Sequence, residues 1–144
     1  MMRLKGKVAI ISGAAHGMGA QEAKLFSEEG AKVVIADVLK NYGKQVETEI
    51  TEAGGEALFL PLDVTCEEDW KRVMNTTVSH FGKLDILVNN AGVTGASKED
   101  PTSIEEWHRV MAVNLTGVFL GTKYAVQEMI KAGKGSIVNI SSIM

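Results

Sequence analysis

The chain has 144 residues, the size of a single domain that can bury a full hydrophobic core. A hydrophobic fraction of 45% and a charged fraction of 23% are ordinary for a soluble globular protein, and no apolar run approaches the length of a membrane span. The net charge of −3, without any basic run, argues against a nucleic-acid partner, because phosphate binding needs concentrated Lys and Arg. Cys66 is the only cysteine, which excludes an internal disulfide and fits a cytoplasmic location.

The first half of the chain alternates short apolar runs with helical patterns. The runs at 8–12, 32–37 and 56–62 are typical of buried parallel strands, and Pro61 suits a strand at the edge of a sheet. We expect helices between them, over about 17–29 and about 42–53. Gly30 and the pair Gly54-Gly55 follow these helices, as is usual where a helix ends.

The second half continues the alternation. Thr65 and Glu68 have the spacing of a capping box, which predicts a helix running to Phe81. Strands are expected at 84–89 and 135–140. Between them, a second possible capping box, Ser103 to Glu106, precedes a long helix over much of 107–132. Strands and helices that alternate in this way predict an α/β fold, a doubly wound parallel sheet (the Rossmann fold) in the order 3-2-1-4-5.

A glycine-rich turn follows the first strand, at Ser12-Gly-Ala-Ala-His-Gly-Met-Gly19. Glycines at this place allow a tight turn, close approach of the backbone to a pyrophosphate, and close packing of helix on strand. The free amides at the start of the following helix would bind the phosphates. The candidate cofactor residues of this turn are Gly13, His16, Gly17, Met18 and Gly19. The alternative interpretation is a glycine-rich turn without a ligand.

Asp37 ends the second strand, where a carboxylate can accept both hydroxyls of an adenosine ribose and repel a 2′-phosphate. At about 4 Å, two unit charges in a partly shielded site repel by up to about 4 kcal/mol. Even half of that energy is a preference of more than tenfold, so the sequence favours NAD over NADP. His16 could instead attract a 2′-phosphate, but we expect the effect of Asp37 to be stronger.

Further residues give the sequence a specific likeness. Asp63-Val64, the run Asn89-Asn-Ala-Gly92, Asn114 within Val-Asn-Leu, and Ser-Ile-Val-Asn-Ile-Ser-Ser142 follow the glycine turn and Asp37 in this order. Over its whole length the sequence therefore resembles the short-chain dehydrogenase/reductase family. It is most similar to NAD-preferring members that oxidise secondary alcohols, including hydroxysteroid and simple cyclic or aliphatic alcohol dehydrogenases.

The resemblance implies roles for matching positions. Asp63 would accept a hydrogen bond from the adenine amino group beside the Val64 amide, and Asn90, Ala91 and Gly92 would line the cofactor cleft and steady the sheet. Ser142, with Ser141 as its structural neighbour, would bind the substrate oxygen. Asn114 would hold a water of the proton relay. The alternatives are a polar turn for Asn89-Asn90 and a purely structural Asn that bends a helix for Asn114.

Two other groups of residues are expected to be structural. Trp70 and Trp107 fall near predicted helix starts, which favours packing or interface roles over substrate contact. His80 and His108 lie on predicted helices without a Cys, His or carboxylate set at metal-ligand spacing, so no metal site is expected.

The family's catalytic Tyr-x-x-x-Lys has no counterpart in these residues, because Val46 and Glu128 stand four positions after Tyr42 and Tyr124. We therefore expect residues 1–144 to form a dinucleotide-binding domain that is incomplete at its C-terminal end, lacks the later strands, and is inactive alone. The longer enzyme would transfer a hydride between NAD(H) and an alcohol or ketone, and would form a homo-oligomer through the long helix. The alternatives are an NAD-binding module without catalysis and a scaffold that keeps only the fold.

Overall fold

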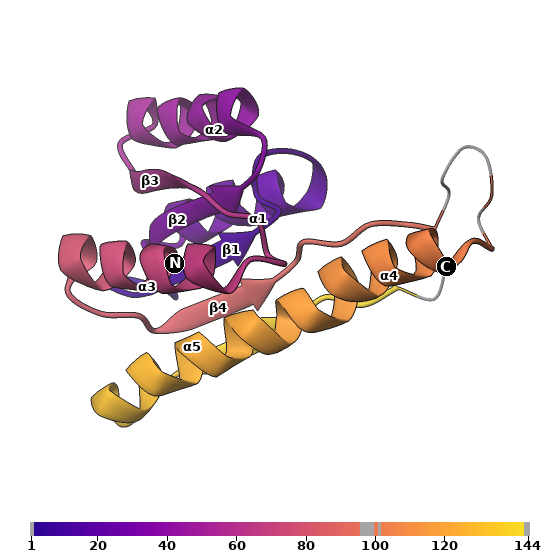
Figure 1. Ribbon diagram of the computed structural model, residues 1–144. Coiled ribbons are helices and arrows are strands. Elements are labelled where there is room, and N and C mark those ends of the chain that lie inside the picture. The colour runs from indigo at the N-terminus through magenta and orange to yellow at the C-terminus, as the bar shows by residue number, and fades with distance from the viewer. Residues whose placement is uncertain (1, 96–99, 101, 143–144) are drawn as a thin grey trace.

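The computed structural model describes residues 2–95, 100 and 102–142. Over these residues helices and strands alternate along the chain (Figure 1). In chain order the elements are β1 (Val8–Ser12), α1 (Gly17–Glu28), β2 (Lys32–Asp37), α2 (Lys40–Glu52), β3 (Glu56–Pro61), α3 (Glu67–Phe81), β4 (Ile86–Asn89), α4 (Ile104–Met111), the π-helical segment η1 (Ala112–Thr116), α5 (Gly117–Ala132) and β5 (Ser136–Asn139).

The strands form one parallel sheet in the order β3-β2-β1-β4-β5, which confirms the predicted topology. β3, which ends at Pro61, lies at the edge of the described sheet as expected. Because all strands run in the same direction, their carboxyl ends share one edge of the sheet, where ligands bind in doubly wound folds. The last residues of the strands at this edge are Ser12, Asp37, Pro61, Asn89 and Asn139.

Apolar side chains fill both faces of the sheet. Ile11, Ile35 and Val88 belong to the core that α1 and α2 complete on one face. Alternate strand residues, such as Ile10, face the other core, which α3 and α5 complete with residues such as Trp70. Successive residues of a strand point to opposite faces of the sheet, and helices cover both faces here, so alternate residues enter different cores.

The two tryptophans differ. Trp70 is fully buried, and its indole N–H donates a hydrogen bond of 3.0 Å to the carbonyl of Val64, which confirms a packing role. Trp107 leaves 58% of its surface exposed on α4. Among the residues that the structure describes, no helix has the length and apolar character needed to cross a membrane.

The predicted long helix after Ser103 is present, but it is not α-helical throughout. Ser103 does cap a helix, since its hydroxyl accepts a hydrogen bond of 3.1 Å from the amide of Glu106. That helix, α4, begins at Ile104 directly after its cap, and the segment Ala112–Thr116 widens into a π-helix before α5 begins. Single π-helical turns of this kind occur mostly within α-helices, often at functional sites.

The predicted capping box at Thr65 is wrong. α3 begins at Glu67 with Cys66 at its N-cap, and no side chain caps it. A cap at Thr65 would require the helix to begin at Cys66, one residue earlier than it does, and the Thr65 hydroxyl instead donates to Asp63 Oδ1 at 2.7 Å. Other boundaries shift by one or two residues: α2 begins at Lys40, β3 ends at Pro61, β4 begins at Ile86 and β5 spans Ser136–Asn139.

Candidate functional site

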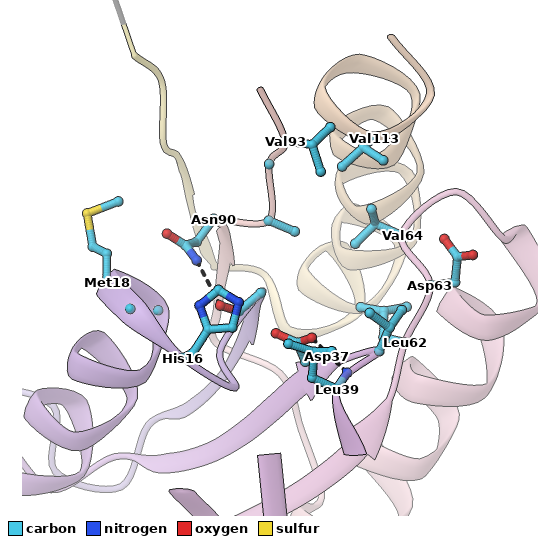
Figure 2. Close-up of a pocket in the computed structure, with 16 residues that line it drawn as sticks. His16, Met18, Asp37, Leu39, Leu62, Asp63, Val64, Asn90, Val93 and Val113 are labelled. Atoms are coloured by element: carbon cyan, nitrogen blue, oxygen red, sulfur yellow. Dashed lines mark hydrogen bonds between the residues drawn. The ribbon is translucent and has the colours of Figure 1, made fainter. Parts of the chain in front are cut away.

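A cleft with a volume of about 440 Å³ opens at the carboxyl edge of the sheet (Figure 2). Every residue assigned above to a cofactor lines it: Gly13, His16, Gly17, Met18, Gly19, Asp37, Asp63, Val64, Asn90, Ala91 and Gly92. The structure thus brings together segments that are far apart in the sequence, and the hydrogen bond from the Ala91 amide to the Ser12 hydroxyl joins two of them across 79 residues. Five further residues complete the lining: Val38, Leu39, Leu62, Val93 and Val113. Sequence reasoning missed these five, although all but Leu39 directly adjoin residues that it identified.

The glycine turn packs closely against the segment that follows β4. Gly13 has a φ of +67°, and a Cβ there would lie 2.8 Å from Ala91 Cα. Gly19 lies within α1, where a Cβ would come 2.3 Å from the carbonyl oxygen of Gly13. Real Cβ atoms do not approach backbone this closely, so both positions require glycine. The turn is therefore held tightly against the residues after β4.

Asn90 and Ser12 connect the turn to the end of β4. The Asn90 side-chain amide donates to the carbonyls of Ser12 and Gly13 at 3.0 and 3.2 Å. The Ser12 hydroxyl accepts from the backbone amides of Asn90 and Ala91, each at 3.1 Å. Asn90 thus braces the glycine turn while it lines the cleft, and its neighbour Asn89 is not in a turn but buried at the end of β4.

The amino end of α1 faces the cleft. His16 occupies the N-cap, no side chain caps the helix, and the first turn holds no acidic residue. The first amides of a helix lack partners within the helix and carry its partial positive charge. Gly17 and Met18, at this end, line the cleft. This arrangement suits a phosphate or pyrophosphate.

Asp37 lies at the centre of the cleft and is only 7% exposed. Its Oδ2 accepts the amide of Ala15 in the glycine turn at 3.0 Å, and its Oδ1 accepts the amide of Leu39 at 2.9 Å. Each carboxylate oxygen can accept more than one hydrogen bond, so both oxygens stay able to bind hydroxyl groups. The carboxylate is thus fixed in place before any ligand binds.

An apolar slot lies beside Asp63. Figure 2 shows Val64, Val93 and Val113 gathered at this side of the cleft, away from Met18. Asp63 is held by its neighbour, because its Oδ1 accepts both the amide and the hydroxyl of Thr65, at 2.9 and 2.7 Å. A slot of three branched apolar side chains with one carboxylate at its edge suits a flat base that carries an amino group.

Neither candidate catalytic residue lines this cleft. Asn114 lies in the π-helical segment, where its side chain forms two hydrogen bonds with the backbone of Val93, both of 2.8 Å. This contact supports a structural role for its side chain. Ser142 is exposed and follows β5, whose continuation still pairs with β4 through the bond of 3.0 Å from the Ile140 amide to the Asn89 carbonyl. Ser142 thus lies just beyond the carboxyl end of β5, on the same side of the sheet as the cleft.

Polar side-chain contacts also tie β4 to its neighbours. The Asn89 side-chain amide donates to Asn139 on β5 at 2.9 Å and to Thr122 on α5 at 3.3 Å. At the amino ends of β1 and β4, Asp85 Oδ2 accepts a hydrogen bond of 2.9 Å from the amide of Val8 and pairs with Lys83 Nζ at 2.8 Å. Sequence reasoning did not identify Asp85, and no motif points to it. These contacts fix the relative positions of β1, β4 and β5 and therefore of the cleft.

An uncapped helix start, a fixed carboxylate and an apolar slot thus follow one another along the cleft. This order matches the pyrophosphate, ribose and base of a dinucleotide, so the residues present fit such a cofactor. No group of three or more His, Cys, Asp or Glu side chains suited to a metal ion occurs within the described ranges.

Comparison with known proteins gives the same family. Residues 7–144 match the short chain dehydrogenase family. The chain is 49% identical over 99% of its length to a 2,5-dichloro-2,5-cyclohexadiene-1,4-diol dehydrogenase (LinX) of Sphingobium indicum, covering 57% of that protein. It is 48% identical over 98% of its length to a 3-alpha-(or 20-beta)-hydroxysteroid dehydrogenase of Mycobacterium bovis, covering 53% of it, and 43% identical over 99% to a cyclopentanol dehydrogenase of a Comamonas strain, covering 57%.

The crystal structure of a short-chain type dehydrogenase/reductase from Mycobacterium marinum superposes with a TM-score of 0.92 at 33% identity, covering 99% of this chain and 58% of that one. The chain thus spans between 53% and 57% of the length of the relatives named above. The family match and these identities show that the chain belongs to the short chain dehydrogenase family.

Proposed function

We propose that this protein binds NAD(H) in the cleft and acts in hydride transfer between NAD(H) and a secondary alcohol or ketone. The observation that carries the proposal is the position of Asp37, whose fixed carboxylate lies at the end of β2 and bonds to the glycine turn that precedes α1. A family whose members are named as diol, hydroxysteroid and cyclopentanol dehydrogenases supports the reaction class.

On this proposal each part of the cleft binds one part of the cofactor. The first amides of α1 bind the pyrophosphate, and Asp37 accepts the hydroxyls of the adenosine ribose. The apolar slot holds the adenine, with Asp63 accepting from its amino group, as the family resemblance implies. A 2′-phosphate would place negative charge against Asp37, so we propose NAD and not NADP as the cofactor.

The nicotinamide supplies the hydride when the cofactor is bound. On the protein side, Ser142 would hold the substrate oxygen and stabilise charge that develops on it. Asn114 would hold a water of the proton relay; its side chain already bonds to Val93, so this role would fall to its backbone carbonyl. These 144 residues contain no Tyr-x-x-x-Lys, and a positioned acid or base contributes about 10²–10⁴ in rate. We therefore propose that residues 1–144 form an incomplete dinucleotide-binding domain that binds the cofactor but is inactive alone.

Self-association of the complete protein is a further part of the proposal. Along α4, η1 and α5, large apolar side chains remain more than half exposed: Ile104, Trp107, Leu115, Phe119 and Ile130. An exposed apolar stripe of this length is typical of an interface between subunits. Replacing Phe119 by Ser should lower the molar mass measured by light scattering if this surface pairs two copies. The single cysteine, Cys66, supports a cytoplasmic location.

The test combines binding with turnover. NADH binding is measured by its fluorescence, both for residues 1–144 and for a longer chain that includes a C-terminal continuation. Both proteins are also assayed for oxidation of cyclopentanol with NAD. The proposal predicts NADH binding by both and turnover by the longer chain alone. Binding by both without turnover by either would favour an NAD-binding module, which the missing Tyr-x-x-x-Lys makes the second candidate. No NADH binding by either would leave only a scaffold role and contradict the proposal.

A further inference from the structure

Two arginines contact the walls of the apolar slot in the same way. On α3, Arg72 pairs with Asp69 three residues before it at 2.7 Å, and its Nη2 donates to the carbonyl of Pro61 at 2.7 Å. On α4, Arg109 pairs with Glu106 three residues before it at 2.6 Å, and its Nη2 donates to the carbonyl of Thr94 at 2.8 Å. The sequence motifs did not reveal either contact.

Both carbonyls lie where the chain leaves the sheet, since Pro61 is the last residue of β3 and Thr94 follows the end of β4. β3 ends at Pro61 and leads into the wall that carries Asp63 and Val64, whereas β4 ends at Asn89 and leads into the wall that carries Val93. At these points no neighbouring strand bonds to the two carbonyls in the described sheet, and arginine side chains of the flanking helices α3 and α4 do so instead.

Additional bonds strengthen each wall. The amide of Asp63 donates to Asp69 Oδ2 at 2.9 Å, so the Asp69–Arg72 pair holds its wall at two points. This bond from the Asp63 backbone, followed by the bond from Arg72, lowers the pKa of Asp69 below its usual value, which keeps the acceptor charged. On the other wall, the bonds from Asn114 fix Val93 next to the Thr94 carbonyl that Arg109 holds.

Because both ion pairs are partly exposed, we expect the bonds from the arginines to the backbone carbonyls to contribute more to the position of the walls than the ion pairs themselves do. Arg72 and Arg109 leave 43% and 45% of their side chains exposed, and an exposed ion pair contributes only about 0–1 kcal/mol by itself. Glu106, in contrast, is 7% exposed and is the one buried residue of α4. A buried carboxylate is costly unless it is paired, and the pairing of Glu106 with Arg109 fixes the guanidinium that bonds to the Thr94 carbonyl.

We propose that Asp69–Arg72 and Glu106–Arg109 are positioning pairs that set the separation between Val64 and Val93 and thereby the affinity of the slot for the nucleotide base. The proposal rests on the proposed function, which places the base in this slot. A base packs against apolar atoms at about 3.5–4.0 Å, and a gap of only 0.5–1 Å loses roughly a quarter to a half of that attraction. Small movements of either wall therefore matter.

The test uses Arg72→Met, Arg109→Met and the double variant, because Met keeps the apolar stem of the side chain but removes the guanidinium. Lys71→Met is the matched control, since Lys71 also pairs with an acid three residues before it, Glu68, on the same helix. The ligands are NADH and reduced nicotinamide hypoxanthine dinucleotide, which differ only in the base.

Each arginine variant should bind NADH about three- to tenfold more weakly, the size of one lost hydrogen bond, and should prefer NADH over the hypoxanthine analogue less than the parent does. The control should match the parent in both respects. A general loss of structure would weaken both ligands equally and leave the preference unchanged. An unchanged preference in both arginine variants would overturn the proposal.

Hydrogen exchange of the ligand-free protein gives a second measurement that does not depend on the cofactor. Amides of residues 62–65 should exchange faster in Arg72→Met, and amides of residues 92–95 should exchange faster in Arg109→Met, while the core of β1 and β2 stays protected. Exchange unchanged in both segments would also overturn the proposal. Failure of the parent protein to bind NADH would contradict the proposed function, and exchange would then decide alone whether the pairs hold the walls.

Discussion

Gly19 offers the sharpest perturbation of the cleft, because its substitution by Ala has two opposing effects. Gly19 lies in the first turn of α1, and Ala is favoured over Gly within a helix by about 1 kcal/mol. The added Cβ would lie 2.3 Å from the Gly13 carbonyl oxygen and 2.5 Å from Nδ2 of Asn90. Helix propensity alone thus predicts a more stable protein, whereas the packing of the glycine turn predicts a less stable one.

The structure indicates that the packing effect is larger. Overpacking a close contact costs about 1–3 kcal/mol. The same movement would weaken the two bonds from Asn90 to Ser12 and Gly13, each contributing about 0.5–1.5 kcal/mol. After the gain in helix propensity is subtracted, we expect Gly19→Ala to lower the free energy of unfolding by about 1–5 kcal/mol, the upper end applying if both bonds are lost. Displacement of the turn should also weaken NADH binding at least tenfold.

Urea unfolding and NADH titration measure the two effects, with Gly121→Ala as the control. A Cβ at Gly121, within α5, would lie 2.6 Å from Asn89 Oδ1 and 2.7 Å from the Trp70 ring, outside the cleft lining. The control should therefore lose stability to a similar degree but keep its NADH affinity. A Gly19→Ala protein that is as stable as the parent and binds NADH equally well would refute this account of the turn.

Two further predictions concern regions away from the cleft. Asp85→Asn should lower the free energy of unfolding by about 1–3 kcal/mol without changing NADH affinity, because the buried carboxylate that accepts from the Val8 amide and from Lys83 lies at the opposite edge of the sheet; urea unfolding checks the first part, and a change in NADH affinity would contradict the second. On α3, hydrogen bonds from Lys123 and then Tyr124 lower the pKa of Glu67 from its usual 4.5 to about 2. A lowered pKa means that the charged form stabilises the fold above about pH 4.5 and that this contribution disappears as the pH falls toward 2. The parent should therefore be more stable than Glu67→Gln at pH 7, and urea midpoints should converge as the pH is lowered; a difference that persists or grows in acid would contradict the assigned contacts.

The order of strands and helices could be predicted because local signals agreed with one another. Apolar runs such as Val8–Ser12 and Lys32–Asp37 are buried on both faces, and a parallel sheet explains both the runs and the helices between them. The glycine turn and Asp37 could be placed at one cleft because parallel strands share a carboxyl edge.

Other features depend on contacts between distant residues and carry no local signal. Thr65 has capping-box spacing, but α3 begins one residue too late for Thr65 to cap it, and its hydroxyl donates to Asp63 in the preceding turn. The break at Ala112–Thr116 comes with the bonds of Asn114 to Val93, which lies 21 residues earlier. Arg109 likewise reaches Thr94 across 15 residues. Spacing within a helix cannot reveal such partners, and the roles of Ser142 and Asn114 remain predictions.

The central claim is that the carboxylate of Asp37 selects a dinucleotide without a 2′-phosphate, and competition between NADH and NADPH tests it most directly. Titration calorimetry on the parent protein should give a dissociation constant for NADH at least tenfold below that for NADPH, since even half of the upper limit of about 4 kcal/mol for the repulsion exceeds a factor of ten. Replacement of Asp37 by Ser should reduce that ratio. Equal or tighter binding of NADPH by the parent protein would contradict the account.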